Sequence, residues 1–442
     1  MENPSSTDFL VKKFDPVVVA PSLPLPKTTL QLSPIDNQIG FRGFFNSLSV
    51  YNAPDDMSAD PVKIIREALS KVLVHYFPLA GRFRNKENGE LEVECTGDGA
   101  LFVEAMVEDN ISVLRDFDDL NPSFQQLAFW PPMGANIEDL HLLVVQVTRF
   151  TCGAITVGVT VCHSIFDGCG AAQFVTALAD MARGEVKPLL EPIWNRELLK
   201  PEDPVHLQLY QFDSLCPPPI LFEELGQASL IINSNTIKYM KQCIMEECKV
   251  FCSTFEVMAA LVWVARTKAF QIPHTENVKL LFAMDMRRSF NPPFPNGYYG
   301  NAIGTAYAMD NVEDLLNGSL SRVVMIIKKS KVSLRDNYLR SNKVKDPYSL
   351  DVNKKDNNVL ALSDWRRLGF HEANFGWGDP VNVTAPQLLG KGLPLLSYYL
   401  FLQPSKNQPD GIKILMSCMH PSAVKSIKME MEAMINKFVT KS

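Results

Sequence analysis

Three residues in the first half of the chain have types and a spacing that could carry out proton transfer: His163, Asp167 and Gly168. A neutral imidazole on a rigid element can take a proton from a hydroxyl or an amine as that group attacks a carbonyl. Asp167 could fix the turn, and Gly168 and Gly170 could supply backbone angles that a Cβ atom would resist. The spacing occurs by chance in roughly one chain in fifty. Because the motif alone is only moderately specific, an alternative stays open, in which the histidine only bonds a neighbouring carbonyl and stabilises the turn.

Cys162 and Cys169 flank this motif and offer a nucleophile in place of a base. An alternating strand would turn Cys162 away from the face that His163 uses, so we expect a base and no covalent acyl-enzyme. The chain has nine cysteines and no CxxC pair. That pattern predicts reduced thiols, with neither a disulfide framework nor a metal site.

The segments on either side of His163 predict the elements that carry it. Two β-rich runs, 142–150 and 154–161, are separated by a short turn with a glycine, which is typical of a hairpin. From about Gly170 onward, apolar residues recur at helical spacing. His163 is therefore expected at a turn that leads from a strand into a helix.

The rest of the chain mixes both element types. Helices are predicted from capping residues and apolar spacing, and strands from alternation or β-rich runs. The predicted elements are a helix after Asp60-Pro61 that ends by Pro78, strands at 90–94, 278–284 and 395–402, a helix from Ser253 to about residue 269, and a last helix at about 422–439. These elements indicate an α/β protein with two comparable halves.

The start of the helix at Ser253 is a candidate anion site. Ser253 and Glu256 fit a capping box, in which each side chain bonds the backbone N–H of the other residue. The free amides of such a helix start, at Ser253 and Thr254, could meet a phosphate of a coenzyme. Plain capping is an equally good explanation.

The length of 442 residues and a proline-rich stretch predict two domains. Seven prolines lie between residues 184 and 219 among charged and polar residues. We therefore expect an N-terminal domain at 1–185 with the histidine motif, a crossover at 186–222, and a C-terminal domain at 223–442.

Composition excludes some functions. Hydrophobic residues make up 46% and charged residues 21%, which suits a globular protein, and the net charge of -6 offers no basic face for nucleic acid. The N-terminus does not have the pattern of a signal peptide, and no run of 18 apolar residues follows. We expect a soluble, cytoplasmic monomer that does not bind a membrane.

Further segments occur in a fixed order around the histidine motif. The segments are Leu32-Ser-Pro-Ile-Asp36, Tyr76-Phe-Pro-Leu-Ala-Gly-Arg82, His163-Ser-Ile-Phe-Asp-Gly168, Asp285-Met-Arg287, Tyr298-Tyr-Gly-Asn301 and Asn374-Phe-Gly-Trp-Gly378. Together they resemble the plant BAHD acyltransferase family over essentially the whole chain. The sequence is most similar to the taxane branch of that family, through Leu91-Glu-Val-Glu-Cys-Thr-Gly97, Gln146-Val-Thr-Arg-Phe-Thr-Cys-Gly153 and Gly297-Tyr-Tyr-Gly-Asn-Ala-Ile-Gly304.

This resemblance implies a fold and a role for each matching residue. The fold would be like that of chloramphenicol acetyltransferase, with two mixed-sheet domains of similar size and a tunnel between them. His163 would be the general base in the tunnel, and Asp167 would point away from the substrates and pair with Arg287 and Asn301. A structural loop near the coenzyme side would consist of Asn374, Phe375, Gly376, Trp377 and Gly378.

The resemblance also implies a reaction of plant specialised metabolism. An acyl group would pass from acyl-CoA, either benzoyl-CoA or acetyl-CoA, to an amine or hydroxyl of a taxane diterpenoid, with no permanently bound cofactor. N-benzoylation of the taxol side chain is the favoured reaction, and taxane O-acetylation or O-benzoylation is the alternative. A catalytically inactive ligand-binding relative is a further alternative. Acyl transfer from a carrier protein would predict a doubled histidine, but Cys162 stands in that place.

One position departs from the family pattern, which usually has aspartate where Asn374 stands. Asparagine keeps an acceptor oxygen but loses the charge, so a salt bridge there would become a neutral hydrogen bond. We therefore expect Asn374→Asp to keep or improve activity.

Overall fold

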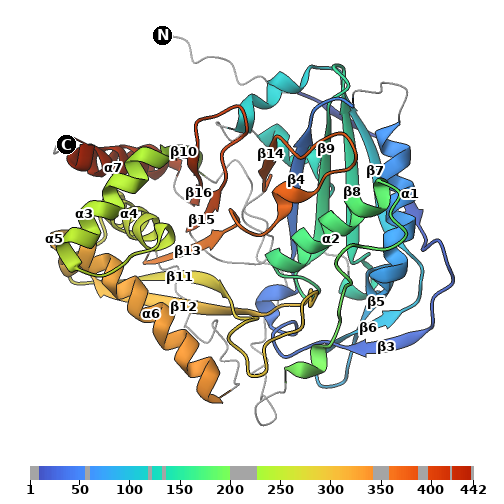
Figure 1. The fold of residues 1–442 in the computed structure, drawn as a ribbon, viewed down its shortest axis with the longest axis horizontal. Coiled ribbons are helices and arrows are strands. Elements are labelled where there is room, and N and C mark those ends of the chain that lie inside the picture. The colour runs from blue at the N-terminus through green and yellow to red at the C-terminus, as the bar shows by residue number, and fades with distance from the viewer. Residues whose placement is uncertain are drawn as a thin grey trace.

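The chain forms two α/β halves, each built around its own sheet (Figure 1). The computed structural model describes residues 9–54, 60–117, 122–131, 136–199, 226–341, 358–386, 397–418 and 421–439. Most of the expected crossover, from residue 200 onward, lies outside these ranges. Within them, no helix combines the length and apolar character that crossing a membrane would require.

The first half contains a seven-stranded sheet in the order β1-β7-β8-β9-β4-β14, with β2 also paired to β7, and a three-stranded sheet in the order β3-β6-β5. Its elements are β1 (Val11–Lys13), β2 (Val17–Val19), β3 (Thr28–Gln31), β4 (Phe44–Tyr51), α1 (Pro61–His75), β5 (Arg82–Asn85), β6 (Leu91–Cys95), β7 (Ala100–Val107), β8 (Leu143–Phe150), β9 (Ile155–Cys162) and α2 (Gly168–Ala182).

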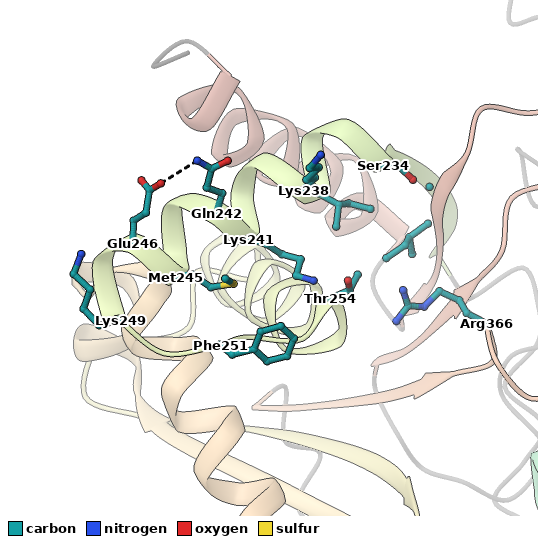
Figure 2. Close-up of a pocket in the computed structure, with 13 residues that line it drawn as sticks. Ser234, Lys238, Lys241, Gln242, Met245, Glu246, Lys249, Phe251, Thr254 and Arg366 are labelled. Carbon is teal, nitrogen blue, oxygen red and sulfur yellow. Dashed lines mark hydrogen bonds between the residues drawn. The ribbon is translucent and has the colours of Figure 1, made fainter.

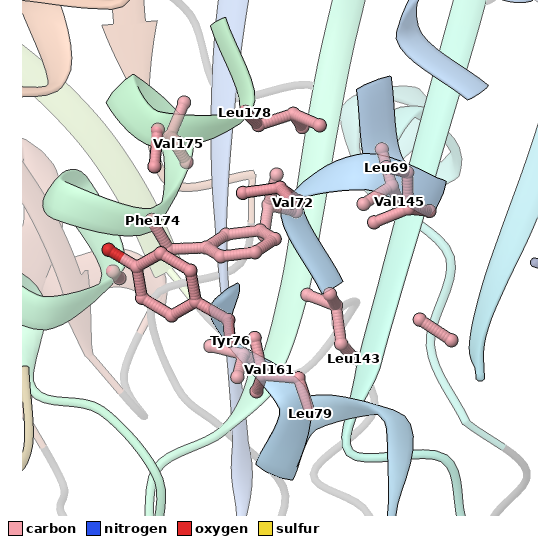
Figure 3. Packing of buried hydrophobic residues seen from close by; sticks show 14 of the residues in the cluster. Leu69, Val72, Tyr76, Leu79, Leu143, Val145, Val161, Phe174, Val175 and Leu178 are labelled. Carbon is pink, nitrogen blue, oxygen red and sulfur yellow. The ribbon is translucent and has the colours of Figure 1, made fainter. Parts of the chain in front are cut away.

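Helix α1 begins where the sequence predicts. The side chain of Asp60 accepts hydrogen bonds from the backbone N–H groups of Val62 and Lys63, and Pro61 occupies the first helical position. Figure 3 shows the apolar faces of α1 and α2 packed against β8 and β9. The predicted hairpin of β8 and β9 is confirmed by their antiparallel pairing. This packing fixes the end of β9, from which the turn that carries His163 departs.

The second half contains a six-stranded sheet in the order β10-β16-β15-β13-β11-β12. Helices α3 to α7 lie on its outer side, away from the first half (Figure 1). Its elements are β10 (Gly226–Asn233), α3 (Ser234–Cys248), α4 (Thr254–Ala269), β11 (Asn277–Asp285), β12 (Ile303–Asn311), α5 (Val312–Asn317), α6 (Leu320–Ser341), β13 (Val359–Asp364), β15 (Ser397–Leu402), β16 (Gly411–Cys418) and α7 (Pro421–Val439).

The two faces of the second sheet have different partners. Tyr399 and Phe401 on β15 belong to the core shared with the helices. Leu400 and Leu402 alternate with them and pack with Ala385 in a separate cluster. The sheet is therefore apolar on both sides.

One segment of the C-terminal domain expected at 223–442 belongs to the first half. Strand β14 (Asn382–Thr384) pairs antiparallel with β4. Phe375 and Val383 are buried in the core of the first half, and the hydroxyl of Tyr51 donates to the carbonyl of Ala373 at 2.8 Å. The first half is therefore not the one continuous stretch of the chain that the sequence predicts, because this later segment buries its apolar side chains in the core of that half.

Candidate active site

His163 lies directly after β9 and before α2, at the predicted turn from strand to helix. Its backbone N–H donates to the carbonyl of Gly43 at 2.8 Å. The imidazole stacks on Phe41, with ring centres 4.4 Å apart and planes 10° apart, and it lies 4.8 Å from the ring of Phe45. His163 is partly exposed. The ring therefore contacts two aromatic side chains, and the residue as a whole is not fully buried.

The environment of His163 favours the neutral imidazole. Burial lowers its pKa below the ordinary value, while its own backbone carbonyl and the charge of Asp167 oppose this to a smaller extent. Nδ1 is buried, and among the described residues it has no hydrogen-bond partner of ordinary geometry. That leaves Nε2 as the nitrogen able to accept a proton from a substrate, which is the state a general base needs at neutral pH.

Asp167 is buried and holds the turn that follows His163. Its carboxylate accepts both terminal nitrogens of Arg287, at 2.9 and 2.8 Å, and it caps α2 by accepting the N–H of Gly170 at 2.9 Å. Burial raises the pKa of Asp167, but Arg287 and the backbone N–H donors outweigh it, so the pKa is lowered overall. The predicted pair of Asp167 and Arg287 is confirmed.

The predicted contact between Asp167 and Asn301 is wrong. The amide of Asn301 donates instead to the carboxylate of Asp36 and to the carbonyl of His163, both at 2.7 Å. Asp36 is fully buried, so its carboxylate requires donors in the interior, and Asn301 supplies them. The backbone N–H of Ala302, the next residue, bonds Asp167 at 3.0 Å.

Gly170 is needed for space and not for an unusual backbone angle, and Gly168 lies close to one flexible side chain. Neither is among the glycines with positive φ. A Cβ atom on Gly170 would lie 2.0 Å from the carbonyl oxygen of Tyr299, and one on Gly168 would lie 2.6 Å from the side chain of Leu368. The start of α2 thus approaches both the Tyr299 turn and the segment around Leu368 closely.

The two cysteines beside the motif are poor nucleophiles. Burial raises the pKa of the Cys162 thiol to about 12, and its sulfur faces the carbonyl of Phe41. Burial also raises the pKa of Cys169. Because only a thiolate attacks readily, neither side chain suits nucleophilic catalysis near neutral pH.

Asn374 organises the loop that it begins. Its side-chain oxygen accepts the N–H groups of Gly376 and Gly378, at 2.8 and 3.2 Å, and its amide donates to Asp379 at 3.3 Å. Both glycines have left-handed backbone angles, with φ of 110° and 104°. The guanidinium of Arg183 bonds the carbonyl of Asn374 and not its side chain. The asparagine side chain thus bonds the loop itself and the neighbouring Asp379.

The aromatic residues of the same loop anchor it to the first half. Phe375 is buried and meets Tyr51 edge-on with ring centres 5.3 Å apart, and Trp377 stacks on Phe375 at 5.8 Å. These contacts describe a structural loop. Its position near the coenzyme side stays a prediction.

A basic pocket of about 760 Å³ lies beside the start of α4 (Figure 2). Figure 2 shows Lys241 and Arg366 extending toward Thr254 from different elements. Lys238, Lys241, Lys249 and Arg366 line the pocket, and Glu246 is its one acidic lining residue among the described residues. Arg366 also bonds Asp364, at 2.8 and 2.5 Å. The pocket therefore favours an anion, with the positive end of α4 adding to the field of the lysines.

The structure separates the two residues proposed for phosphate binding. Thr254 lines the basic pocket, whereas Ser253 is engaged in the capping box with Glu256, whose Oε2 accepts the Ser253 N–H at 2.8 Å. The side chain of Ser253 accepts the N–H of Glu256 at 3.2 Å. The capping prediction is confirmed.

Sequence reasoning missed several residues around the site. Asp36 stood within a matched segment without a role, Arg196 lay unnoticed in the proline-rich crossover, and Phe45 had no motif. The spacing of Lys238 and Lys241 on one side of a helix was the one signal available for the pocket. For Asp36, Arg196 and Phe45 the sequence offers no such signal, because the residues that they contact come from distant parts of the chain.

Comparison with sequence families and curated proteins gives consistent matches over the full length. A family described as the Transferase family matches residues 9–434. The chain is 74% identical over 441 residues to 3'-N-debenzoyl-2'-deoxytaxol N-benzoyltransferase of Taxus canadensis, covering 100% of both chains. It is 60% identical over 439 residues to taxadien-5-alpha-ol O-acetyltransferase of Taxus cuspidata, covering 98% of this chain and 99% of the relative.

Solved structures share the fold at low identity. Vinorine synthase gives a TM-score of 0.71 at 19% identity, covering 96% of this chain and 98% of that one. TRI101 of F. sporotrichioides, complexed with coenzyme A and T-2, gives 0.68 at 16% identity, covering 91% and 97%. These likenesses confirm the predicted fold class of two mixed α/β halves.

Proposed function

Because the chain belongs to the Transferase family and is an acyl-transferring enzyme, we propose that it transfers a benzoyl group from benzoyl-CoA to the free side-chain amine of a taxane. The observation that carries this is the imidazole of the partly exposed residue His163, which contacts the rings of Phe41 and Phe45 and whose lowered pKa favours the neutral form. The relative that is 74% identical over the full length supports the choice of acceptor and acyl group.

In this reaction His163 acts as a general base. Nε2 takes a proton from the acceptor nitrogen as that nitrogen attacks the thioester carbonyl, a C–N bond forms, and the C–S bond then breaks. The protonated imidazole returns the proton to the departing thiolate, so free coenzyme A leaves and His163 is neutral again. Asp167 takes no part in proton transfer, because Arg287 and backbone donors occupy its carboxylate.

The phosphates of acyl-CoA are proposed to bind in the basic pocket beside Thr254. Lys238, Lys241 and Lys249 offer ammonium groups there, and the first turn of α4 adds backbone N–H groups. A charged coenzyme end held at this pocket would leave the neutral pantetheine arm to reach toward His163. The proposal rests on charge, and it does not depend on Ser253.

The surroundings of His163 favour an aroyl group over acetyl. Phe45 is partly exposed next to the imidazole, and Trp365, also partly exposed, meets Phe45 edge-on with ring centres 6.4 Å apart. Partly exposed aromatic side chains near the reacting atoms gain more from a benzoyl ring than from a methyl group. Taxane O-acetylation is the second candidate, because an O-acetyltransferase is 60% identical over nearly the whole chain.

We also propose that the enzyme works as a monomer in the cytoplasm. Contacts within one chain hold the turn at His163, through Asp167 with Arg287 and through Asn301, and this supports a site formed within one molecule. Size-exclusion chromatography with light scattering, together with a fluorescent fusion in plant cells, would test these two points.

The deciding experiment supplies the purified protein with benzoyl-CoA or acetyl-CoA and with matched taxanes that carry a free side-chain amine or a free hydroxyl. Mass spectrometry identifies each product, and a thiol reagent follows coenzyme release. N-benzoyl product formed faster than any other supports the proposal. A faster O-acetyl product would favour the second candidate, and no thiol release with any pair would indicate an inactive relative.

A further inference from the structure

Arg196, at the end of the described crossover, is buried beneath the catalytic turn. Its side chain is 1% exposed, and Nε lies 2.8 Å from Oδ2 of Asp36, which is also fully buried. The guanidinium carbon lies 4.1 Å from the ring centre of Trp194 and 4.9 Å from that of Tyr299. Burying a charged side chain costs free energy unless well-placed partners, here a carboxylate and aromatic rings, compensate for the lost water.

The crossover reaches this place by pairing with a turn of the second half. The N–H of Ile193 donates to the carbonyl of Gly297 at 2.9 Å, and Ile193 forms an isolated bridge with Tyr298. A Cβ atom on Gly300 would lie 2.3 Å from the guanidinium of Arg196. Glycine at position 300 therefore leaves the space that the guanidinium fills.

Asp36 connects Arg196 to the backbone of His163 through Asn301. Its Oδ1 accepts both the backbone N–H of Asn301, at 3.1 Å, and the Asn301 side-chain amide, at 2.7 Å. The same side-chain amide donates to the carbonyl of His163 at 2.7 Å. Arg196 also donates directly to the carbonyl of Ile165 at 2.9 Å. The catalytic turn is thus held at two carbonyls, and both connections lead to Arg196.

We propose that Arg196 is a positioning residue for the general base: through Asp36 and Asn301 it fixes the backbone at His163, and so the direction in which the imidazole faces the substrates. The inference depends on the proposed role of His163. It makes the crossover a part of the catalytic architecture as well as a connection between the halves. Small displacements of a base from its reacting partner reduce the rate steeply, while binding of the substrates elsewhere is unaffected.

The test compares Arg196→Lys with Arg266→Lys. Arg266 is a matched control, since it is also fully buried, lies 4.4 Å from the ring centre of Phe270 and bonds Ser397 in the second half. A lysine at 196 keeps the charge but cannot reach both Asp36 and the Ile165 carbonyl with a planar fork. We expect kcat per folded molecule to fall by roughly tenfold or more at position 196, with the KM for acyl-CoA nearly unchanged. At position 266 stability alone should fall.

A second readout does not need the acyl transfer reaction. In protein labelled with ¹⁵N-histidine, the imidazole signal of His163, assigned from its loss in His163→Gln, reports its titration. Because burial lowers the pKa of His163, a loosened ring in Arg196→Lys should titrate closer to ordinary histidine. If the wild-type protein shows the lowered His163 titration but transfers no benzoyl group, the proposed function is contradicted. The effect of Arg196→Lys on that titration still tests the positioning role.

The proposal is overturned if Arg196→Lys is folded, turns over at the wild-type rate and leaves the His163 titration unchanged. If that variant does not fold, the neutral pair Arg196→Met with Asp36→Asn removes both buried charges and should show the same loss of kcat. If the pair does not fold either, Asn301→Ala removes the hydrogen bond to the His163 carbonyl and keeps the ion pair of Arg196 and Asp36. A wild-type kcat in the first of these variants that folds rejects the proposal.

Discussion

Arg287 binds both carboxylate oxygens of Asp167, a residue 120 positions earlier in the chain, with N–O distances of 2.9 and 2.8 Å. Asp167 caps α2, the helix that starts right after the turn carrying His163, and Arg287 follows β11 of the second sheet. This one pair therefore joins the two halves beside His163.

Replacing Asp167 with alanine should reduce stability and activity together. The change takes from the partly buried guanidinium of Arg287 one of its two carboxylate partners, leaving Asp285, and removes the cap of α2. Together these losses cost about 2 to 4 kcal/mol of unfolding free energy. Thermal denaturation measures the first effect, and turnover of the remaining folded enzyme measures the second. Arg287→Lys is the matched control: it keeps the charge, loses the two-pronged contact and should lie between wild type and Asp167→Ala. A fully stable but inactive Asp167→Ala would instead indicate direct participation in the chemistry.

The pH dependence of activity should show the lowered pKa of His163. The base is active when unprotonated, so kcat/KM should be constant at neutral pH and fall as the pH drops through a midpoint below 6.5, the ordinary value for histidine. The measurement is kcat/KM from pH 4.5 to 8.5, corrected for the separate titration of the acceptor amine. A midpoint above 6.5 would show that burial does not control this imidazole.

Removing one ammonium from the basic pocket should weaken coenzyme binding without changing the chemistry. For Lys241→Ala we expect the KM for benzoyl-CoA to rise by about fivefold to twentyfold at an unchanged kcat, since one charge-assisted contact is lost. Lys425→Ala, an exposed lysine on α7, is the control. S-benzoylpantetheine has no nucleotide phosphates, so both variants should use it as well as wild type does. If Lys241→Ala raises the KM for S-benzoylpantetheine as much as the KM for benzoyl-CoA, the phosphates do not bind at Lys241.

Asn374→Asp should keep its activity and lose some stability. The new carboxylate would face Asp379, to which the present amide donates, so we expect a loss of about 0.5 to 1 kcal/mol of unfolding free energy at pH 7. Chemical denaturation of wild type and variant at pH 7 measures this loss. A tenfold fall in kcat would show that this loop is used in catalysis.

Local patterns were sufficient for much of the fold. The cap at Asp60, the capping box at Ser253 and the hairpin before His163 depend on neighbours in sequence, and the structure confirms all three. The pair of Asp167 and Arg287 came from family resemblance, because no local rule connects residues so far apart.

Long-range partners account for what the sequence did not reveal. Asn301 bonds Asp36 and not Asp167, and Asp36 in turn pairs with Arg196 from the crossover. Buried polar groups must find partners in the interior, but their identity depends on how the two halves meet. The same holds for β14, whose strand-like residues could have joined either sheet and pair with β4.

The most direct test of the account is the turnover of His163→Ala beside its affinity for acyl-CoA. Isothermal titration with benzoyl-CoA should give a Kd within a few-fold of wild type, because the proposed phosphate pocket is separate from the imidazole. Thiol release with the taxane amine should fall by about 10² or more, as loss of a general base requires. Unchanged thiol release in a folded His163→Ala variant would contradict the central claim.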